Sequence, residues 1–267
     1  MLYKILLEEK ALFHVHTFRC GHAERVEDEV YVRAALYAGA KHLYFTDHGP
    51  FPGNPFGSRM HYEELSEYLH TLGELKKRYE GVLTIHIGLE MEYLPSYRSY
   101  YEDLLATSGM ELLILGQHFS EIARGRYSFD LEGENLRKTF HHLSAVGIAE
   151  GIETGFFPVV AHPDRHFWFQ DTWNASCEEA GKIITGRALK KGVILEKNLA
   201  SLRDGFYREE FWPLFPREGR VVVGCDAHDP KNLLKDARLL QEGVFMESGW
   251  YKGGEENHGE TKLDTES

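Results

Sequence analysis

Seven short apolar runs recur along the 267-residue chain, and each one ends in, or is soon followed by, a side chain able to bind a metal ion. The runs and these side chains are LFHVH (His14, His16), HLYFTDH (Asp47, His48), LTIHIGL (Glu90), ELLILGQH (His118), FPVVA (His162), GVILEKN (Asn198) and VVVGC (Asp226, His228). In a parallel barrel the carboxyl ends of all strands meet on one face, where the loops carry the chemistry. The placement therefore predicts that scattered histidines and acids form one multi-metal site.

Segments with helical spacing separate these runs. They cover residues 27–40, 60–79, 133–150, 177–192 and 230–243. The first places Val30, Ala34 and Ala38 on one stripe, with Gly39 as a stop signal. Strands that alternate with helices predict an α/β fold with a mainly parallel sheet. Seven such units in a chain of this length favour a closed or nearly closed barrel, with the metal site at the C-terminal ends of its strands.

Two segments interrupt the alternation. Residues 49–60, GPFPGNPFGSRM, are dense in Gly and Pro and are predicted to form a long loop after the second strand. Residues 163–174, PDRHFWFQDTWN, are aromatic and follow the fifth strand. Both would overhang the predicted site, where they could line a substrate pocket or simply close the mouth of the barrel.

Length and charge limit the functions to consider. A chain that is 42% hydrophobic can bury one barrel-sized core. We expect a single domain at residues 1–251 and a polar, mobile tail at 252–267. The net charge of −12 argues against nucleic-acid binding, which needs clustered Lys and Arg. It does not exclude a small anionic substrate, because bound divalent cations can reverse the local potential.

The cysteines and the N-terminus indicate the compartment. Cys20, Cys177 and Cys225 are too few and too scattered for a disulfide framework. The N-terminal MLYKILLEEKALF has acidic residues where a signal peptide would continue its apolar stretch. No window approaches the roughly 18 apolar residues that span a membrane. The sequence thus predicts a soluble cytoplasmic protein without membrane contact, and it makes no prediction of the oligomeric state.

The chemistry of the strand ends supports metal binding. Alternate residues of a strand point to the same side, so His14 and His16 can face one ion while Phe13 and Val15 pack outward. Glu90 ends a strand expected to be buried, where an unpaired carboxylate is costly and a metal partner removes that cost. Mixed imidazole and carboxylate ligands favour Zn²⁺, Mn²⁺ or Fe²⁺ over Ca²⁺ or Mg²⁺.

Nine side chains form the candidate metal set. They are His14, His16, His22, His48, Glu90, His118, His162, Asp226 and His228. Any one alone is more simply a hydrogen-bonded polar residue, but together they recur near strand ends while the predicted helices carry ordinary Leu and Ala stripes. The other histidines are expected to be structural, except that His166, close to His162, stays open.

Six motifs resemble, in chain order, those of the PHP (polymerase and histidinol phosphatase) superfamily, and above all its monofunctional histidinol-phosphatase branch. They are HVHTFRCGHAE, TDHGPF, GLEMEY, GQHF, AHPD and CDAHDP. The resemblance runs from about residue 12 to residue 230. It implies a distorted (β/α)₇ barrel that holds three divalent metal ions.

The resemblance also implies how the ligands are shared. The first ion would be held by His14, His16, Glu90 and Asp226. The second would share Glu90 and be completed by His118 and His162. The third would be held by His22, His48 and His228.

Related phosphatases keep basic residues near the phosphate, and this chain offers similar ones. Arg165 in HPDRHF and Arg203 in NLASLRDG match best, and Arg59 in GSRM is a further candidate for substrate binding. The family often reads EIN on the sixth strand, where this chain has Glu196-Lys197-Asn198. We expect this lysine to face outward.

The predicted activity is metal-dependent hydrolysis of a small phosphate monoester, with L-histidinol phosphate as the leading substrate. Two metals about 3.5–4 Å apart can share a water and lower its pKa toward about 7, and the resulting hydroxide would attack phosphorus. Ions and arginines would neutralise the equatorial oxygens. Glu90, Asp226 and Arg165 are the candidate catalytic residues, and Asp229 or His48 could protonate the leaving group.

Three alternatives stay open. A phosphatase of the same fold could act on another substrate, such as a phosphotyrosine protein or a nucleotide. A nuclease or proofreading role would need a basic groove that the sequence does not show. A non-catalytic metal-binding module is opposed by the complete set of nine ligands.

Overall fold

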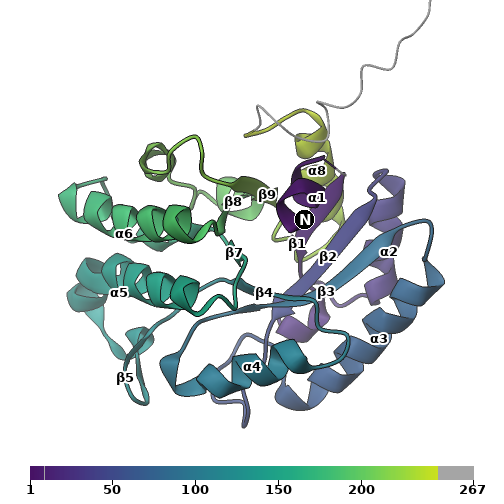
Figure 1. Ribbon diagram of the computed structural model, residues 1–267, viewed down its shortest axis with the longest axis horizontal. Helices are drawn as coiled ribbons and strands as arrows, with labels where there is room; N and C mark the ends of the chain where they lie inside the picture. The colour runs from purple at the N-terminus through teal and green to yellow at the C-terminus, as the bar shows by residue number, and fades with distance from the viewer. Residues whose placement is uncertain (9, 246–267) are drawn as a thin grey trace, which may run out of the picture.

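A sheet of seven parallel strands forms the centre of the computed structural model, which describes residues 1–8 and 10–245 (Figure 1). In sheet order, which is also chain order, the strands are β1 (Ala11–Val15), β2 (His42–His48), β3 (Thr84–Met91), β4 (Leu112–Leu115), β7 (Val159–Val160), β8 (Ile194–Asn198) and β9 (Val221–Gly224). Every neighbouring pair is parallel. Each of the seven apolar runs is therefore a strand, as predicted.

The sheet curls into a nearly closed barrel because the segment that follows β9 returns to β1. The backbone N–H of Cys225 donates to the carbonyl of Phe13 at 2.8 Å, and that of His16 donates to the carbonyl of Ala227 at 3.0 Å. Val15 and Ala227 form an isolated parallel bridge. The prediction of a distorted (β/α)₇ barrel is confirmed, and β1 pairs irregularly both at this seam and with β2.

Helices cover the outside of the barrel (Figure 1). They are α2 (Asp28–Tyr37), α3 (Leu65–Arg78), α4 (Arg98–Ala106), α5 (Gly133–Thr154), α6 (Ala175–Lys191) and α8 (Pro230–Gln241). A short helix, α7 (Leu199–Arg203), directly follows β8. A further helix, α1 (Leu2–Glu8), contacts β1 and β9. The sequence did not predict the small hairpin of β5 (Glu121–Ala123) and β6 (Arg126–Tyr127).

Alternation along the strands separates two hydrophobic clusters. The outer cluster packs strand residues beneath the helices and includes Leu12, Leu43, Ile87, Leu113 and Leu195. The inner cluster fills the barrel and includes Phe13, Tyr44, Ile114, Val159 and Ile194, with Leu6 of α1 packed against them. The barrel interior is thus solid beneath the face where the strands end.

The prediction that Phe13 packs outward with Val15 is wrong. Phe13 belongs to the inner cluster, where its ring lies 5.4 Å from that of Tyr44. The pairing of β1 with β2 shifts between Leu12 and Val15, and His14 has a left-handed φ of 68°. Because a bulge adds a residue to one strand, two successive side chains, Phe13 and His14, can both turn inward.

The predicted stripe on the first helix is also shifted. Val30 is 40% exposed, whereas Tyr31, Ala34 and Ala35 are buried. The large Tyr31 ring takes the inward position that the apolar spacing had given to Val30. The helix ends at Tyr37, just before the predicted stop signal.

Among the residues described, no helix is long and apolar enough to cross a membrane. The predicted boundary at residue 251 and the tail at 252–267 lie outside the described residues and stay predictions.

Replacing Phe13 by Ala is expected to lower the free energy of unfolding by about 3–5 kcal/mol, because it leaves a cavity inside the barrel. Urea unfolding monitored by circular dichroism measures this change. Tyr37→Ala, at a side chain that is 81% exposed, is the control and should change stability by less than about 0.5 kcal/mol. Equal effects of the two substitutions would contradict a packed barrel interior.

Candidate metal centre

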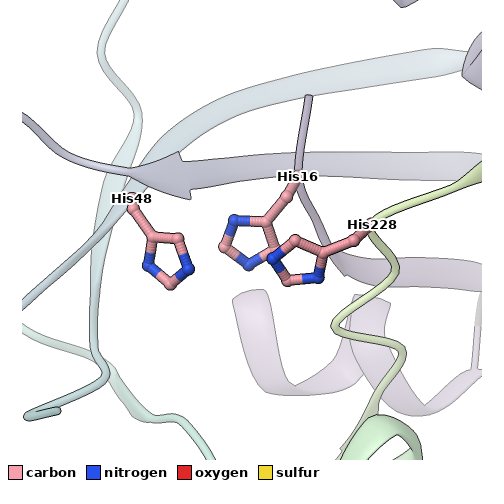
Figure 2. A group of neighbouring side chains, drawn as sticks. All are labelled: His16, His48 and His228. Atoms are coloured by element: carbon pink, nitrogen blue, oxygen red, sulfur yellow. The ribbon is translucent and has the colours of Figure 1, made fainter. Parts of the chain in front are cut away.

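The carboxyl ends of the strands bring all nine predicted ligands together. They form overlapping groups whose potential ligand atoms lie within 4.8 Å of one another. Figure 2 shows three of them, His16, His48 and His228, which come from separate segments of the chain. The ring centroid of His16 lies 4.4 Å from that of His48 and 4.2 Å from that of His228. The cluster is thus continuous across the mouth of the barrel.

Glu90 lies at the centre of the cluster and is only 1% exposed. Its Oε2 is 3.0 Å from Nδ1 of His48 and 3.4 Å from Nε2 of His14. Its Oε1 is 2.8 Å from Nε2 of His162 and 3.7 Å from Nε2 of His118. One carboxylate therefore faces imidazoles from four different segments, which is the geometry required of a bridging ligand.

Asp226 forms a second acidic position beside β1. Its Oδ1 lies 3.3 Å from Nε2 of His16 and 3.8 Å from Nε2 of His14. On the other side, Oδ2 accepts a hydrogen bond of 3.1 Å from Nη1 of Arg165. Asp226 thus joins the histidines of β1 to a predicted substrate-binding arginine.

The possible ligand groups resemble the predicted sharing but differ in detail. The groups are His14–His16–Asp226, His14–Glu90–His162, His48–Glu90–His118, His16–His48–His228 and Cys20–His22–His228. His118 and His162 fall into separate groups that both contain Glu90. The buried thiol of Cys20 joins His22, which the sequence did not suggest.

Several buried ligand atoms have no hydrogen-bond partner among the described residues. They are Nε2 of His14, both ring nitrogens of His16, Nδ1 of His162 and Nε2 of His228. A buried polar atom without a partner costs about 1–3 kcal/mol. A coordinated cation removes that cost, so the donor set fits divalent ions that accept nitrogen and oxygen ligands.

Metal binding requires neutral imidazoles and ionised carboxylates, and three of the histidines and both acids meet this requirement. Burial and the neighbouring His48 lower the pKa of His16 to about 3, and burial lowers that of His48 to about 4. Burial and His16 lower the pKa of His228 to about 3. Burial alone would raise the pKa of Glu90 and Asp226, but the facing imidazoles hold both well below their usual range.

His14 and His118 are exceptions. Burial lowers the pKa of each, but Glu196 beside His14 and Glu90 beside His118 raise it above the usual value. A bound ion would therefore have to displace a proton there.

Two buried carboxylates that the sequence analysis did not assign orient the ligands. Glu196 lies 2.8 Å from Nδ1 of His14 and accepts a hydrogen bond of 3.1 Å from the backbone N–H of His162. Glu92 lies 2.9 Å from Nδ1 of His118. Such carboxylates fix the tautomer and orientation of metal-binding histidines. The signal was present, since Glu92 follows Glu90 by two residues and Glu196 precedes Asn198 by two.

The backbone is strained at three of the candidate ligands. His14, His162 and Asp226 have positive φ angles of 68°, 33° and 50°. Residues other than glycine in this region cost about 1–3 kcal/mol and cluster at functional sites. The strain turns these side chains into the cluster instead of along the strand alternation.

A cavity of about 910 Å³ opens above the cluster. All three predicted arginines, Arg59, Arg165 and Arg203, line it. Phe56 and Ser58 contribute from the loop at 49–60, and Trp168 contributes from the loop at 163–174. The two loops therefore overhang the cluster, as expected, and line this cavity.

The remaining candidates have other surroundings. Both carboxylate oxygens of Asp229 accept hydrogen bonds from Asn232, so Asp229 caps α8. His166 is buried against Phe140 and belongs to none of the ligand groups found in the described part of the chain. Lys197 faces outward, as expected, but it is partly buried, and its amine lies 5.2 Å from the centroid of the Trp212 ring.

The fold and the cluster define a parallel barrel with a polynuclear metal centre at its mouth. Residues 13–199 match the PHP domain. Because this match spans well over half of the chain, the protein belongs to the PHP domain family, which confirms the resemblance found in the sequence.

Relatives of known name agree with this membership. A protein of Deinococcus radiodurans named "Probable histidinol-phosphatase" is 28% identical over 234 residues, which cover 81% of this chain and 85% of the relative. The histidinol-phosphatase of Bacillus subtilis is 29% identical over 152 residues, which cover 54% of this chain and 56% of the relative.

A solved structure shares the fold at lower sequence identity. It is histidinol phosphate phosphatase from Lactococcus lactis, complexed with zinc, L-histidinol and phosphate. It aligns with a TM-score of 0.66 and 19% identity, over 86% of this chain and 94% of that chain.

Gly224 leaves the space that Glu196 occupies, because a Cβ at this position would lie only 1.7 Å from Oε1 of Glu196. Gly224→Ala is therefore expected to displace Glu196 from His14 and to weaken zinc binding about 10–100-fold. Competition with a chromophoric chelator measures the affinity. Gly186→Ala, on an exposed helical position with no atom within 4 Å of the added methyl, is the matched control. Unchanged zinc affinity in Gly224→Ala would contradict this role of Glu196.

Proposed function

We propose that this protein hydrolyses a small phosphate monoester with the help of divalent metal ions, and that its substrate is L-histidinol phosphate. The observation that carries the proposal is the cluster of nine candidate ligands at the floor of the cavity, with unpartnered buried ligand atoms. The names of the Deinococcus and Bacillus relatives support the reaction. The zinc, L-histidinol and phosphate of the Lactococcus complex support the metal and the substrate.

The proposed metal centre holds three ions of zinc, manganese or iron. His14, His16 and Asp226 would bind the first, with Glu90 reaching across to the second beside His118 and His162. His22, His48 and His228 would bind the third. When bound, such ions lower the pKa of a water molecule and polarise phosphate oxygens. Glu90 and Asp226 act by holding the ions in place.

The arginines would bind the phosphate. Arg165 extends over Asp226 and lines the cavity, so its guanidinium can reach an oxygen of a phosphate seated against the cluster. Arg203 also lines the cavity, and its guanidinium donates to Asp236 at 3.0 Å. Arg59 contributes less directly, because Glu92 and the carbonyl of Gly49 already occupy its guanidinium. Guanidinium groups suit this task, since they match phosphate oxygens in pairs.

A second candidate is the hydrolysis of a larger phosphoester. The cavity of about 910 Å³ lies at the upper end of the range of roughly 300–1,000 Å³ for small-molecule sites, so it admits bulkier leaving groups. A nuclease role is less favoured because the chain carries a net charge of −12. The cytoplasmic location expected from the sequence stays a prediction.

Phosphate release from L-histidinol phosphate, in the presence of Mn²⁺ or Zn²⁺, tests the proposal directly. We expect turnover well above that of an aryl phosphate or a phosphodiester. His118→Ala and Asp226→Ala should reduce kcat at least 100-fold because they remove ligands, whereas His70→Ala, at an exposed position on α3, should leave activity unchanged. Slow release from the aryl phosphate alone would keep the metal site and overturn the substrate.

Removing metal is expected to destabilise the folded protein. A ligand that binds only the native state stabilises it by about 4 kcal/mol at a concentration 1,000 times its Kd. A chelator should therefore lower the Tm by several degrees, and added Zn²⁺ should restore it. Differential scanning fluorimetry measures the shift. In the Asp226→Ala variant the shift should shrink, and a Tm that never responds to metal would argue against the proposed centre.

A further inference from the structure

We propose that Glu92 couples the loop at residues 49–60 to the candidate ligand His118, so that metal binding and the ordering of this cavity wall stabilise each other. This inference rests on the metal centre proposed above. Glu92 itself would not bind metal, and the loop at residues 49–60 would not contact the ions.

The central observation is one buried carboxylate shared by two partners. Glu92 directly follows β3 and is 1% exposed. Its Oε1 lies 2.9 Å from Nδ1 of His118 and accepts a hydrogen bond of 3.1 Å from Nη2 of Arg59. Its Oε2 accepts a further bond of 2.9 Å from Nη1 of Arg59. The side chain therefore connects the cluster on one side with the loop on the other.

Arg59 forms the internal anchor of the loop. Its side chain is only 7% exposed. The guanidinium carbon lies 5.5 Å from the ring centroid of Phe51, 5.7 Å from that of Phe56 and 5.5 Å from that of Phe119. Phe51 and Phe56 belong to the loop, and Phe119 follows His118. An arginine packed among aromatic rings orders the segment around it, so the position of the loop depends on the pair with Glu92.

Backbone bonds connect both ends of the loop to the cluster as well. The N–H of Gly49 donates to the carbonyl of Glu90 at 2.8 Å, and the N–H of Met60 donates to the carbonyl of His48 at 3.1 Å. Between these ends, residues 55–59 line the cavity. The loop is thus a wall of the cavity that is held at three points, all next to candidate ligands.

The energetic consequence follows from burial. Removing one partner of a buried ion pair is strongly destabilising, because it leaves an uncompensated buried charge. Loss of the Arg59 contact therefore frees Glu92 to shift, and the ring of His118 loses its orientation. By linkage, if the ordered loop strengthens metal binding, then bound metal stabilises the ordered loop by the same free energy.

Two substitutions, one at Glu92 and one at Arg59, test the coupling through zinc affinity and hydrogen exchange, which do not depend on activity. Glu92→Gln is expected to weaken zinc binding at one class of sites about 10–100-fold. Arg59→Met, which leaves both Glu92 and His118 in the chain, is expected to weaken the same sites about fivefold or more. Chelator competition measures both affinities. In the wild type, zinc should slow hydrogen exchange of residues 49–60, and this protection should be lost in both variants.

The controls separate coupling from general damage. Glu111→Gln removes a carboxylate that lies 2.8 Å from Nδ1 of His86, outside the cluster, and should leave zinc affinity and loop exchange unchanged. Arg59→Lys keeps the charge and should have an effect smaller than Arg59→Met. A cooperative thermal transition in each variant confirms that it is folded.

Each outcome bears on one proposal. Weakened zinc binding in Glu92→Gln with unchanged binding in Arg59→Met would overturn the coupling. Hydrogen exchange of residues 49–60 that is the same with and without zinc in the wild type would overturn it as well. A wild-type protein that binds no zinc would instead overturn the metal centre. Binding and coupling without phosphoester hydrolysis would overturn the proposed reaction alone.

Discussion

The structure depends on one buried carboxylate. Glu90 is 1% exposed. It faces four histidines from four different segments of the chain: His14, His48, His118 and His162. A buried charge is stable only with partners, so these segments must converge for the fold to tolerate it. The neighbouring backbone leaves room for the group, because a Cβ on Gly116 would lie 2.3 Å from its Oε1. The site is therefore complete only when the strand ends of the barrel converge.

The strand ends could be predicted from the sequence because the signal is local. An apolar run followed by His or Asp is visible without knowing the fold, and a parallel barrel then places all such ends on one face. Details that depend on tertiary pairing could not be found in this way. The bulge at His14 arises where β1 meets both β2 and the segment after β9. The sequence pattern contains no sign of this bulge, so it predicted that Phe13 faces outward although Phe13 faces the barrel interior.

The roles of the two orienting carboxylates, Glu92 and Glu196, could be predicted from the sequence only in part. Glu92 and Glu196 each stand two residues from another polar residue on the same strand or at its end, a spacing that places both side chains on one face. The spacing shows that they point toward the cluster, but not whether they bind metal or hold a ligand. Only the contacts of Glu92 with His118 and of Glu196 with His14 indicate that these carboxylates orient a ligand. The sequence could likewise nominate Arg59 but not show that Glu92 already occupies its guanidinium.

Each arginine of the cavity is paired with a buried carboxylate: Arg59 with Glu92, Arg165 with Asp226 and Arg203 with Asp236. Such pairing orients the guanidinium groups before any ligand arrives, which lowers the entropy lost on binding. It also offsets the charge of Arg59 and Arg165, and the buried carboxylates Glu90 and Glu196 lie nearby. A phosphate would then meet a site whose attraction has to come from bound cations, since their charge outweighs local acidic residues. In the proposed enzyme the arginines would thus mainly orient the phosphate, and the bound metal ions would supply most of the affinity for an anionic substrate.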